Sequence, residues 1–477
     1  MKVSAEAKKQ KEIARLEKEQ AKQKWKGYIA YLLFVVTVIY IADEVVSQIN
    51  TQMQSVIASQ VFAPLVGDEF AVARLTAVGT FTMISTVLAM FYRPLSDRFG
   101  RKIFLVINTL GMGVGIVIIG LCTSIPVYIL GAMIIGFFTP HDMQAVYVQE
   151  CAPPEHRGKM YSTVKCFATV GIVLIPVLRS IFIKGADMSG WRFVYIIPGL
   201  IAIVAAIIAL IGIRESDAFI ESRLRTLKMS DEDREKEAQN ARKANGEKTG
   251  IIQGMKFLFS HKQTRWILVA YCALMLGICV TTYYETILTT GYAQQFVATG
   301  LDLAAAKTQA TSIVTQALML FSVGSGLAQL FPGFVADKLG RKKAVIASSV
   351  VVLVGFLGYY FGSQYNWNPY FVGALCGACT GAYWALTDIL LLMVSESVPT
   401  SIRASVATAS GLVILVPTMV IMIAVMAVVN ILGDAAITTI ILATVVPGML
   451  LTILTLLFKV KETNGVDLGA ITGDEFE

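Results

Sequence analysis

The 477-residue chain is 55% hydrophobic and only 15% charged. This composition excludes an ordinary soluble multidomain protein and indicates a polytopic membrane protein. Lys and Arg outnumber Asp and Glu by 40 to 33, a net charge of +7. Because the basic residues fall mainly in loops on one predicted face, we interpret this charge as membrane orientation rather than as nucleic-acid binding.

Residues 1–26 are polar and basic and contain no apolar stretch with a cleavage site, so we expect no secretory signal. Two interpretations of this segment remain open. It is either a helix on the anionic inner leaflet of the membrane or a solvated tail.

Twelve apolar runs follow, each long enough to cross a hydrocarbon core of about 30 Å. They lie near 28–50, 72–95, 103–122, 126–149, 160–183, 193–213, 266–290, 308–335, 344–363, 369–394, 404–430 and 435–459. The predicted divisions are a first six-helix bundle (27–213), a polar cytoplasmic loop (214–265), a second bundle (266–459) and a cytoplasmic tail (460–477).

Basic residues concentrate in the N-terminal segment, in two short turns (98–102 and 338–343), in the central loop and at the end of the last run. The alternate loops hold only Arg74, Lys184, Arg192 and Lys307. We therefore predict that both termini are cytoplasmic and that the chain lies in the inner (cytoplasmic) membrane.

Three short motifs occur twice in the same order. Asp97-Arg98-x-Gly100-Arg101-Lys102 returns 240 residues later as Asp337-Lys338-x-Gly340-Arg341-Lys342. Glu150 and Arg157 correspond to Glu396 and Arg403, and Glu215-Ser216 corresponds to Glu462-Thr463. Three motifs at nearly one period indicate two homologous halves of six helices each.

These motifs resemble the signature of the major facilitator superfamily, in particular its sugar and organic-ion porter branch. The resemblance implies an all-α membrane protein with twelve transmembrane helices in two pseudo-twofold-related six-helix bundles. It also implies a charge network at the cytoplasmic helix ends, made of Asp97, Arg98, Arg101, Glu150, Arg157, Asp337, Arg341, Glu396 and Arg403. Simple topological anchoring is the alternative role for these charges. The first copy departs from the family pattern, because Arg93 stands where a glycine is usual.

The first span carries the richest group of ionisable residues within the membrane, where such residues indicate function by default. Apolar side chains form one helical stripe from Val45 onward, while Asp43, Glu44 and Gln48 belong to the polar face. Asp43 or Glu44 is predicted to bind a proton or a cation, and the two remain equal candidates. A carboxylate held by neighbouring hydroxyls and amides is the structural alternative.

The internal repeat supplies a second candidate site. Asp142 and Asp388 each lie eight residues before the repeated glutamate, at equivalent depth in the fourth and tenth spans. His141 precedes Asp142, and Tyr383 and Trp384 lie one helical turn from Asp388. An aromatic ring beside a carboxylate is suited to a cationic or proton-coupled substrate. A pair of carboxylates that only tethers helices is equally compatible with this pattern.

Other charged residues in the spans are interpreted as structural. Arg179 in the fifth span is expected to snorkel to the membrane surface, and Glu285 is expected at the outer mouth of the seventh. Cys376-x-x-Cys379 is interpreted as helix packing rather than as a metal site. The sequence contains no nucleophile–base arrangement, metal-ligand spacing or cofactor loop, so we predict neither an enzyme nor a bound metal or cofactor.

The sequence therefore predicts a secondary transporter of a small organic ion, coupled to protons and working by alternating access. A sugar or polyol is the alternative substrate. Sugar is disfavoured because Ala273, Leu274 and Cys279 occupy positions that are polar in the sugar-binding family pattern. A sensor that kept the fold without transport is the second alternative. The predicted partners are a small molecule, protons and the lipid bilayer, and the resemblance implies a monomer.

Overall fold

The computed structural model describes residues 2–21, 27–92, 95–139, 143–151, 157–184, 187–229, 251–399 and 402–464. These residues form helices and short connections, with one isolated β-bridge between Lys184 and Asp187 among them. The helices up to the central loop are α1 (Lys2–Gln20), α2 (Tyr28–Gln52), α3 (Gln54–Ile57), the π-helix η1 (Ala58–Phe62), α4 (Ala63–Val66), α5 (Ala71–Ala77), α6 (Gly79–Tyr92), α7 (Ser96–Phe99), α8 (Arg101–Gly120), α9 (Ile125–Phe138), α10 (Met143–Cys151), α11 (Arg157–Gly171), α12 (Leu174–Phe182), α13 (Trp191–Gly212) and α14 (Asp217–Lys228).

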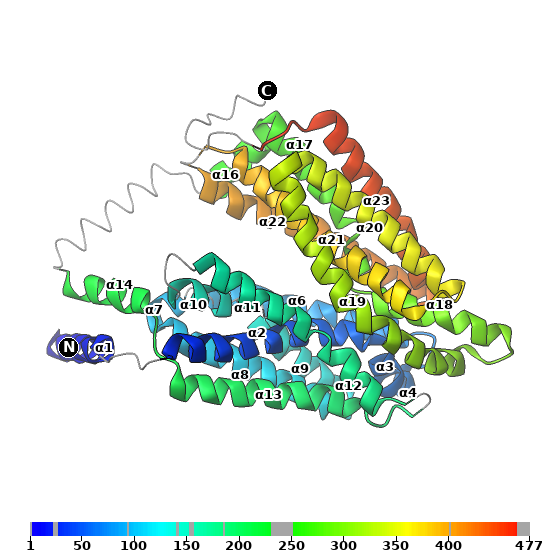
Figure 1. Cartoon of the computed structure of the whole chain (residues 1–477), viewed down its shortest axis with the longest axis horizontal. Helices are drawn as coiled ribbons and strands as arrows, with labels where there is room; N and C mark the ends of the chain where they lie inside the picture. The colour runs from blue at the N-terminus through cyan, green and yellow to red at the C-terminus, as the bar shows by residue number, and fades with distance from the viewer. Residues whose placement is uncertain are drawn as a thin grey trace. The chain divides into compact units, whose positions relative to one another are not determined.

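The remaining helices follow the central loop (Figure 1). They are α16 (Ile251–Ser260), α17 (Lys262–Met275), the 3₁₀ helix η4 (Ile278–Thr281), α18 (Tyr284–Ala298), α19 (Leu303–Leu339), α20 (Arg341–Gln364), α21 (Pro369–Glu396), α22 (Arg403–Leu432), the 3₁₀ helix η5 (Asp434–Ala436) and α23 (Ile437–Lys459).

Ten helices within the described ranges are long and apolar enough to cross a membrane, and they coincide with ten of the twelve predicted spans. The other two predicted spans are interrupted. The described parts of the fourth are α9 and α10, and residues 276–283 divide the seventh into α17 and α18. Each of these helices is shorter than 18 residues, the minimum length for a membrane-crossing helix in this count. The interruptions therefore explain why ten of the twelve predicted spans are found as continuous helices.

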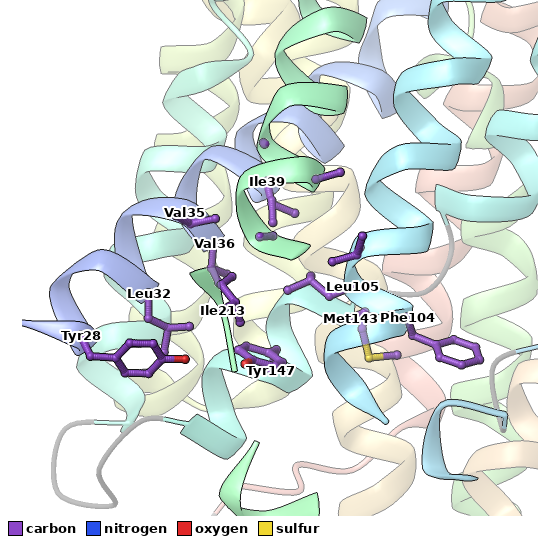
Figure 2. Packing of buried hydrophobic residues seen from close by; sticks show 14 residues of the cluster. Tyr28, Leu32, Val35, Val36, Ile39, Phe104, Leu105, Met143, Tyr147 and Ile213 are labelled. Carbon is purple, nitrogen blue, oxygen red and sulfur yellow. The ribbon is translucent and has the colours of Figure 1, made fainter. Parts of the chain in front are cut away.

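The chain forms two compact units, of which the first comprises Met1–Asn50, Val78–Ile175 and Gly190–Arg242. Its buried apolar cluster joins α2, α8, α10 and α13, and Figure 2 shows the side chains that meet there. Tyr147 of α10 is fully buried in this cluster and donates its hydroxyl hydrogen to the main-chain oxygen of Arg214. The cluster thus ties the described part of the fourth span to the end of the sixth.

The N-terminal segment is helical and packs on α14 within this first unit, as Figure 1 also shows. Leu16 is buried against Ile220, Leu224 and Leu227. Ion pairs flank this contact, from Arg223 to Glu12 at 2.9 Å and from Lys228 to Glu17 at 2.7 Å. The described residues of α1 are therefore helical and use their apolar side against α14, while a position of this helix on the membrane surface stays a prediction.

The second unit comprises Thr51–Ala77, Pro176–Ser189 and Lys243–Glu477. Two segments from the first half of the sequence thus pack with the second half. Within this unit α19 and α21 approach closely, because glycines of α21 face the main chain of α19. A Cβ atom on Gly373, Gly377 or Gly381 would collide with the main chain of α19. Small residues at such a contact are typical of helix packing in membranes.

Candidate functional site

A network of polar contacts joins the predicted cytoplasmic ends of α8 and α10 in the first unit. Arg101 donates from Nε to Oε1 of Glu150 at 3.0 Å. The hydroxyl of Ser216 donates to the other oxygen of Glu150 at 2.6 Å. The carboxylate of Glu215 accepts the main-chain N–H groups of Arg101 and Lys102 at 2.9 and 3.0 Å. It therefore caps the N-terminus of α8, where unpaired N–H groups favour a negative charge.

The second unit repeats this network with the equivalent residues. Arg341 donates from Nε to Oε1 of Glu396 at 3.2 Å, and Thr463 donates to Oε2 at 2.7 Å. Glu462 accepts the main-chain N–H groups of Arg341 and Lys342 at 2.8 and 3.2 Å. The motifs that repeat along the sequence thus form the same contacts twice.

The glycine of each turn is required by this geometry. Gly100 and Gly340 have φ angles of +114° and +103°, a region that side chains disfavour. A Cβ atom at either position would also collide with the carboxylate of Glu215 or Glu462. The two capping glutamates were not among the predicted site residues, although the repeated Glu-Ser and Glu-Thr pairs were a signal that could have identified them.

The remaining predicted members of the charge network have different outcomes. The side chains of Asp97, Arg98, Arg157 and Asp337 lie outside the described part of the structure. Arg403 donates to the main-chain oxygens of Ser395 and Val398 at 3.0 and 3.2 Å, which holds the end of α21.

Burial raises the pKa of Glu215, while its main-chain hydrogen bonds act in the opposite direction.

Asp43 occupies a buried position on α2, with 7% of the residue exposed. The side-chain amide of Gln144 on α10 donates to Oδ2 of Asp43 at 2.7 Å, and Gln144 is itself buried. Glu44 and Gln48 are half-buried. The first span thus brings a carboxylate to a polar residue of the fourth span. Sequence reasoning did not single out Gln144, although a glutamine within an apolar run is a usable signal.

The second predicted group is only partly brought together. His141 and Asp142 lie outside the described residues. Tyr383 is fully buried and donates its hydroxyl to the main-chain oxygen of Leu274 at 3.2 Å, so it joins α21 to α17. Trp384 is 42% exposed, and Asp388, one turn further, is also exposed. Asp388 is near enough to Tyr271 of α17 to interact with it electrostatically.

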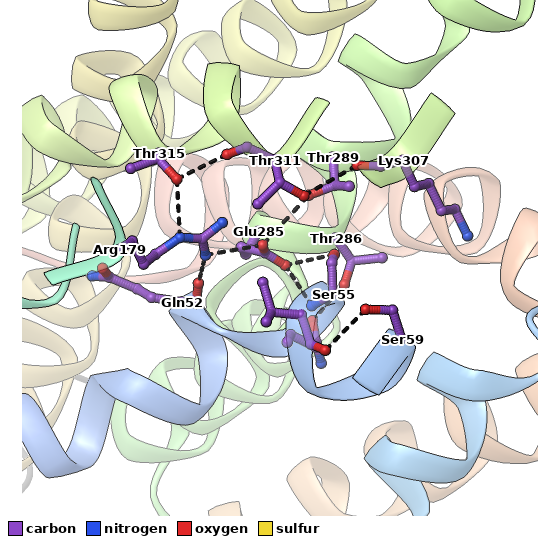
Figure 3. Close-up of polar contacts among 12 residues, drawn as sticks. Gln52, Ser55, Ser59, Arg179, Glu285, Thr286, Thr289, Lys307, Thr311 and Thr315 are labelled. Carbon is purple, nitrogen blue, oxygen red and sulfur yellow. Dashed lines mark hydrogen bonds and ion pairs between the residues drawn. The ribbon is translucent and has the colours of Figure 1, made fainter. Parts of the chain in front are cut away.

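A buried ion pair in the second unit was not predicted (Figure 3). Nη1 of Arg179 on α12 lies 3.1 Å from Oε1 of Glu285 on α18, and neither side chain is exposed. The expectation that Arg179 snorkels is therefore wrong, and Glu285, which was expected at the outer mouth of the seventh span, is fully buried. A fully buried charge requires a partner, and each residue supplies the partner of the other.

The pair also satisfies main-chain groups at a break in the first span. Here α2 ends at Gln52 and α3 begins at Gln54. Arg179 donates to the freed oxygen of Gln52, while Oε2 of Glu285 accepts the N–H and the hydroxyl of Ser55 at 2.8 and 2.7 Å. Arg179 also donates from Nε to Thr315 at 3.2 Å. Broken helices with paired main-chain groups are typical of the binding regions of secondary transporters.

The comparisons with known proteins agree with this architecture. The sequence profile described as "Sugar (and other) transporter" matches residues 27–474. A glucose transporter of Staphylococcus epidermidis is 25% identical over 355 residues, which cover 69% of this chain and 73% of that protein. A putative metabolite transport protein of Bacillus subtilis is 27% identical over 55% of this chain and 56% of its own length.

Solved structures show the same fold. The crystal structure of a D-xylose–proton symporter is similar over 92% of this chain and all of its own, with a TM-score of 0.62 and 16% identity. A partially occluded, inward-open xylose transporter from E. coli is similar over 93% of this chain and all of its own, with a TM-score of 0.61 and 16% identity.

The chain has the all-α fold of the major facilitator type, with twelve transmembrane helices in two six-helix bundles. The chain belongs to the sugar (and other) transporter family. It is a multi-pass membrane protein that carries a small molecule, not an enzyme.

Proposed function

We propose that this protein is a proton-coupled secondary transporter of a small organic ion that works by alternating access, and that Asp43 binds the coupled proton. The hydrogen bond between Gln144 and Asp43 carries this proposal. A carboxylate inside a membrane span is costly and is commonly kept for function.

The partner of Asp43 is suited to a change of protonation state. The amide of Gln144 donates to an ionised carboxylate, and its oxygen can accept from a protonated carboxyl after the amide turns. The contact with Gln144 therefore supports reversible protonation of Asp43.

Exposed groups on α21 support a positively charged substrate. Trp384 and Asp388 are exposed one helical turn apart, and Asp388 is near enough to Tyr271 of α17 to interact with it electrostatically. A carboxylate and an aromatic ring at this separation suit an organic cation. Glu44, Gln48, His141 and Asp142 stay predicted members of the site, whereas the hydroxyl of Tyr383 is engaged in helix packing.

The duplicated networks support rocking of two rigid halves. Glu150 joins Arg101 to Ser216, and Glu396 joins Arg341 to Thr463. Each network thus holds three segments of its own half together. Rigid bundles that rock about a central site are the usual basis of alternating access. We also propose cytoplasmic termini in the inner membrane and a monomeric state, the former supported by the distribution of basic residues.

Transport of a neutral sugar is the second candidate. The family profile and the similarity to a glucose transporter favour it. The apolar residues Ala273, Leu274 and Cys279 oppose it, because they leave the hydroxyls of a sugar without hydrogen-bond partners.

Flux into proteoliposomes tests the proposal. Purified protein with a trapped pH-sensitive dye is challenged with organic cations, carboxylates and sugars. We expect the internal pH to move with one class of organic ion, and this movement to be lost in Asp43→Asn. Asp302→Asn is the matched control, since exposed Asp302 only caps α19, through Ala305, and asparagine also caps helices. Exchange of a labelled sugar without a pH change would refute proton coupling and select the second candidate.

A further inference from the structure

A pocket of about 290 Å³ lies beside the buried pair of Arg179 and Glu285, within the second unit. Ser55 lines this pocket and donates its main-chain N–H and its hydroxyl to Glu285. Thr286, which follows Glu285 in α18, also lines the pocket. Thr311 lines it as well and lies one turn from Thr315, the hydroxyl partner of Arg179. The hydroxyl-bearing residues Ser55, Thr286 and Thr311 thus form one wall of the pocket, and Figure 3 shows these residues around the ion pair.

The rest of the pocket is built from the predicted outer connections. Asp68 and Glu69 follow the first span, Lys307 immediately precedes the eighth, and Asp434 joins the eleventh to the twelfth. Asp434 also accepts the main-chain N–H groups of Val72 and Ala73, both at 2.9 Å. The pocket therefore extends from these outer connections to the wall of hydroxyl-bearing residues.

We propose that Glu285 is a second proton-binding site, reached from the outer side through this pocket, and that its protonation opens the outer side of the transporter. This inference rests on the proposed function, because it assigns a further coupling group to the same transport cycle. The ligand is a proton from the outer solution, which binds a carboxylate oxygen of Glu285.

Protonation would weaken the contacts that hold the first half of the sequence in the second unit. Ionised Glu285 attracts Arg179 and accepts both hydrogen bonds from Ser55. A neutral carboxyl loses its ionic attraction to Arg179 and is a weaker acceptor. Residues 51–77 and 176–189 are then less firmly bound, and their release is the motion that outward opening needs.

The ionisable groups near Glu285 come from several of the elements packed around it. Arg179 is the cation from α12, and arginine stays protonated. Tyr284 on α18 and Tyr359 on α20 carry phenols, whose ordinary pKa is about 10. α3 carries no ionisable side chain. Lys307 and Asp434 line the pocket, and Cys376 on α21 lies beside Tyr284.

Labelling of an introduced cysteine from outside intact cells tests this proposal without any knowledge of the substrate. Thr311→Cys places the probe in the buried wall of the pocket, where the threonine only donates to its own helix at Lys307. Thr299→Cys is the reference, because this residue is exposed at the end of α18 and reports the pH dependence of the thiol chemistry alone. The protein without either substitution gives the background.

We expect the ratio of the two labelling rates to rise as the pH falls from 8 to 5, by up to about tenfold per pH unit, the limit for one linked proton. Glu285→Gln imitates the protonated state and should show a high ratio at every pH. A ratio that ignores pH in the parent protein, or that keeps its pH dependence in Glu285→Gln, would overturn the proposal.

Two further variants keep the test decisive. If Glu285→Gln does not reach the membrane, Glu285→Asp must shift the midpoint of the labelling profile, and an unchanged midpoint refutes the role of Glu285. In Asp43→Asn, the labelling ratio should keep its pH dependence even though proton-coupled flux is lost. This separates failure of the outer site from failure of the proposed function, since labelling requires no transported substrate.

Discussion

The buried pair of Arg179 and Glu285 allows a test in which a second substitution should restore stability. Arg179→Met leaves Glu285 buried without its cation, and removing one partner of such a pair typically destabilises a protein by about 3–5 kcal/mol. Glu285 would still accept two hydrogen bonds from Ser55 and one from Thr289 at 3.4 Å, so we expect the lower end of this range. Adding Glu285→Gln to Arg179→Met removes the unpaired charge and keeps an acceptor for Ser55.

The double variant should therefore be more stable than Arg179→Met alone, although Glu285→Gln by itself destabilises the native protein. The assay is thermal unfolding of purified protein in detergent, evaluated as a double-mutant cycle. Arg192→Met is the matched control, because Arg192 donates to the main-chain oxygens of Gly120 and Cys122 at 3.0 and 2.7 Å. Glu285→Gln should not rescue that variant. Additive effects of Arg179→Met and Glu285→Gln would refute the pairing argument.

Three further predictions follow from local geometry. Gly340→Ala should lower the free energy of unfolding by about 1–3 kcal/mol, because it forces an unfavourable φ and a collision with Glu462. The control is Gly411→Ala in α22, where a Cβ meets nothing within 4 Å, and it should leave the melting temperature unchanged or raise it. Burial raises the pKa of Glu215 above its ordinary value of 4.5. The contribution of Glu215 to stability therefore falls as the pH rises from 4.5 through the raised pKa. The difference in melting temperature between wild type and Glu215→Gln should fall over the same pH range. Leu16→Asn should release α1 from α14, seen as faster proteolysis of the N-terminal segment, whereas the same change at exposed Lys11 should have no effect.

The repeated motifs show which contacts between distant residues can be inferred from short sequence patterns. The family resemblance implied a charge network that includes Arg101, Glu150, Arg341 and Glu396, and the structure pairs Arg101 with Glu150 and Arg341 with Glu396. The same pair forms in both units because the two halves carry the same residues in the same order. The capping role of Glu215 was not predicted, because it depends on how the chain turns back after the sixth span to meet the start of α8.

Asp43 and Arg179 mark the limit of sequence reasoning inside the membrane. The helical stripe of the first span placed Asp43 on a polar face, but its partner depends on the rotation of α10 relative to α2. Arg179 was assigned to the membrane surface because snorkelling is the usual solution for a charge near a helix end. The break between α2 and α3 provides a different solution, which no local residue pattern signals.

The sequence by itself determined the all-helical membrane architecture, the two homologous halves and the positions of the charged turns. These features follow from hydropathy, span length and repeated spacing, which are local or periodic properties of the chain. Only the tertiary structure decided which buried polar groups meet, namely Gln144 with Asp43 and Arg179 with Glu285. Such partners are selected by helix rotation and by interruptions that free main-chain groups, and both depend on contacts between segments distant in the sequence.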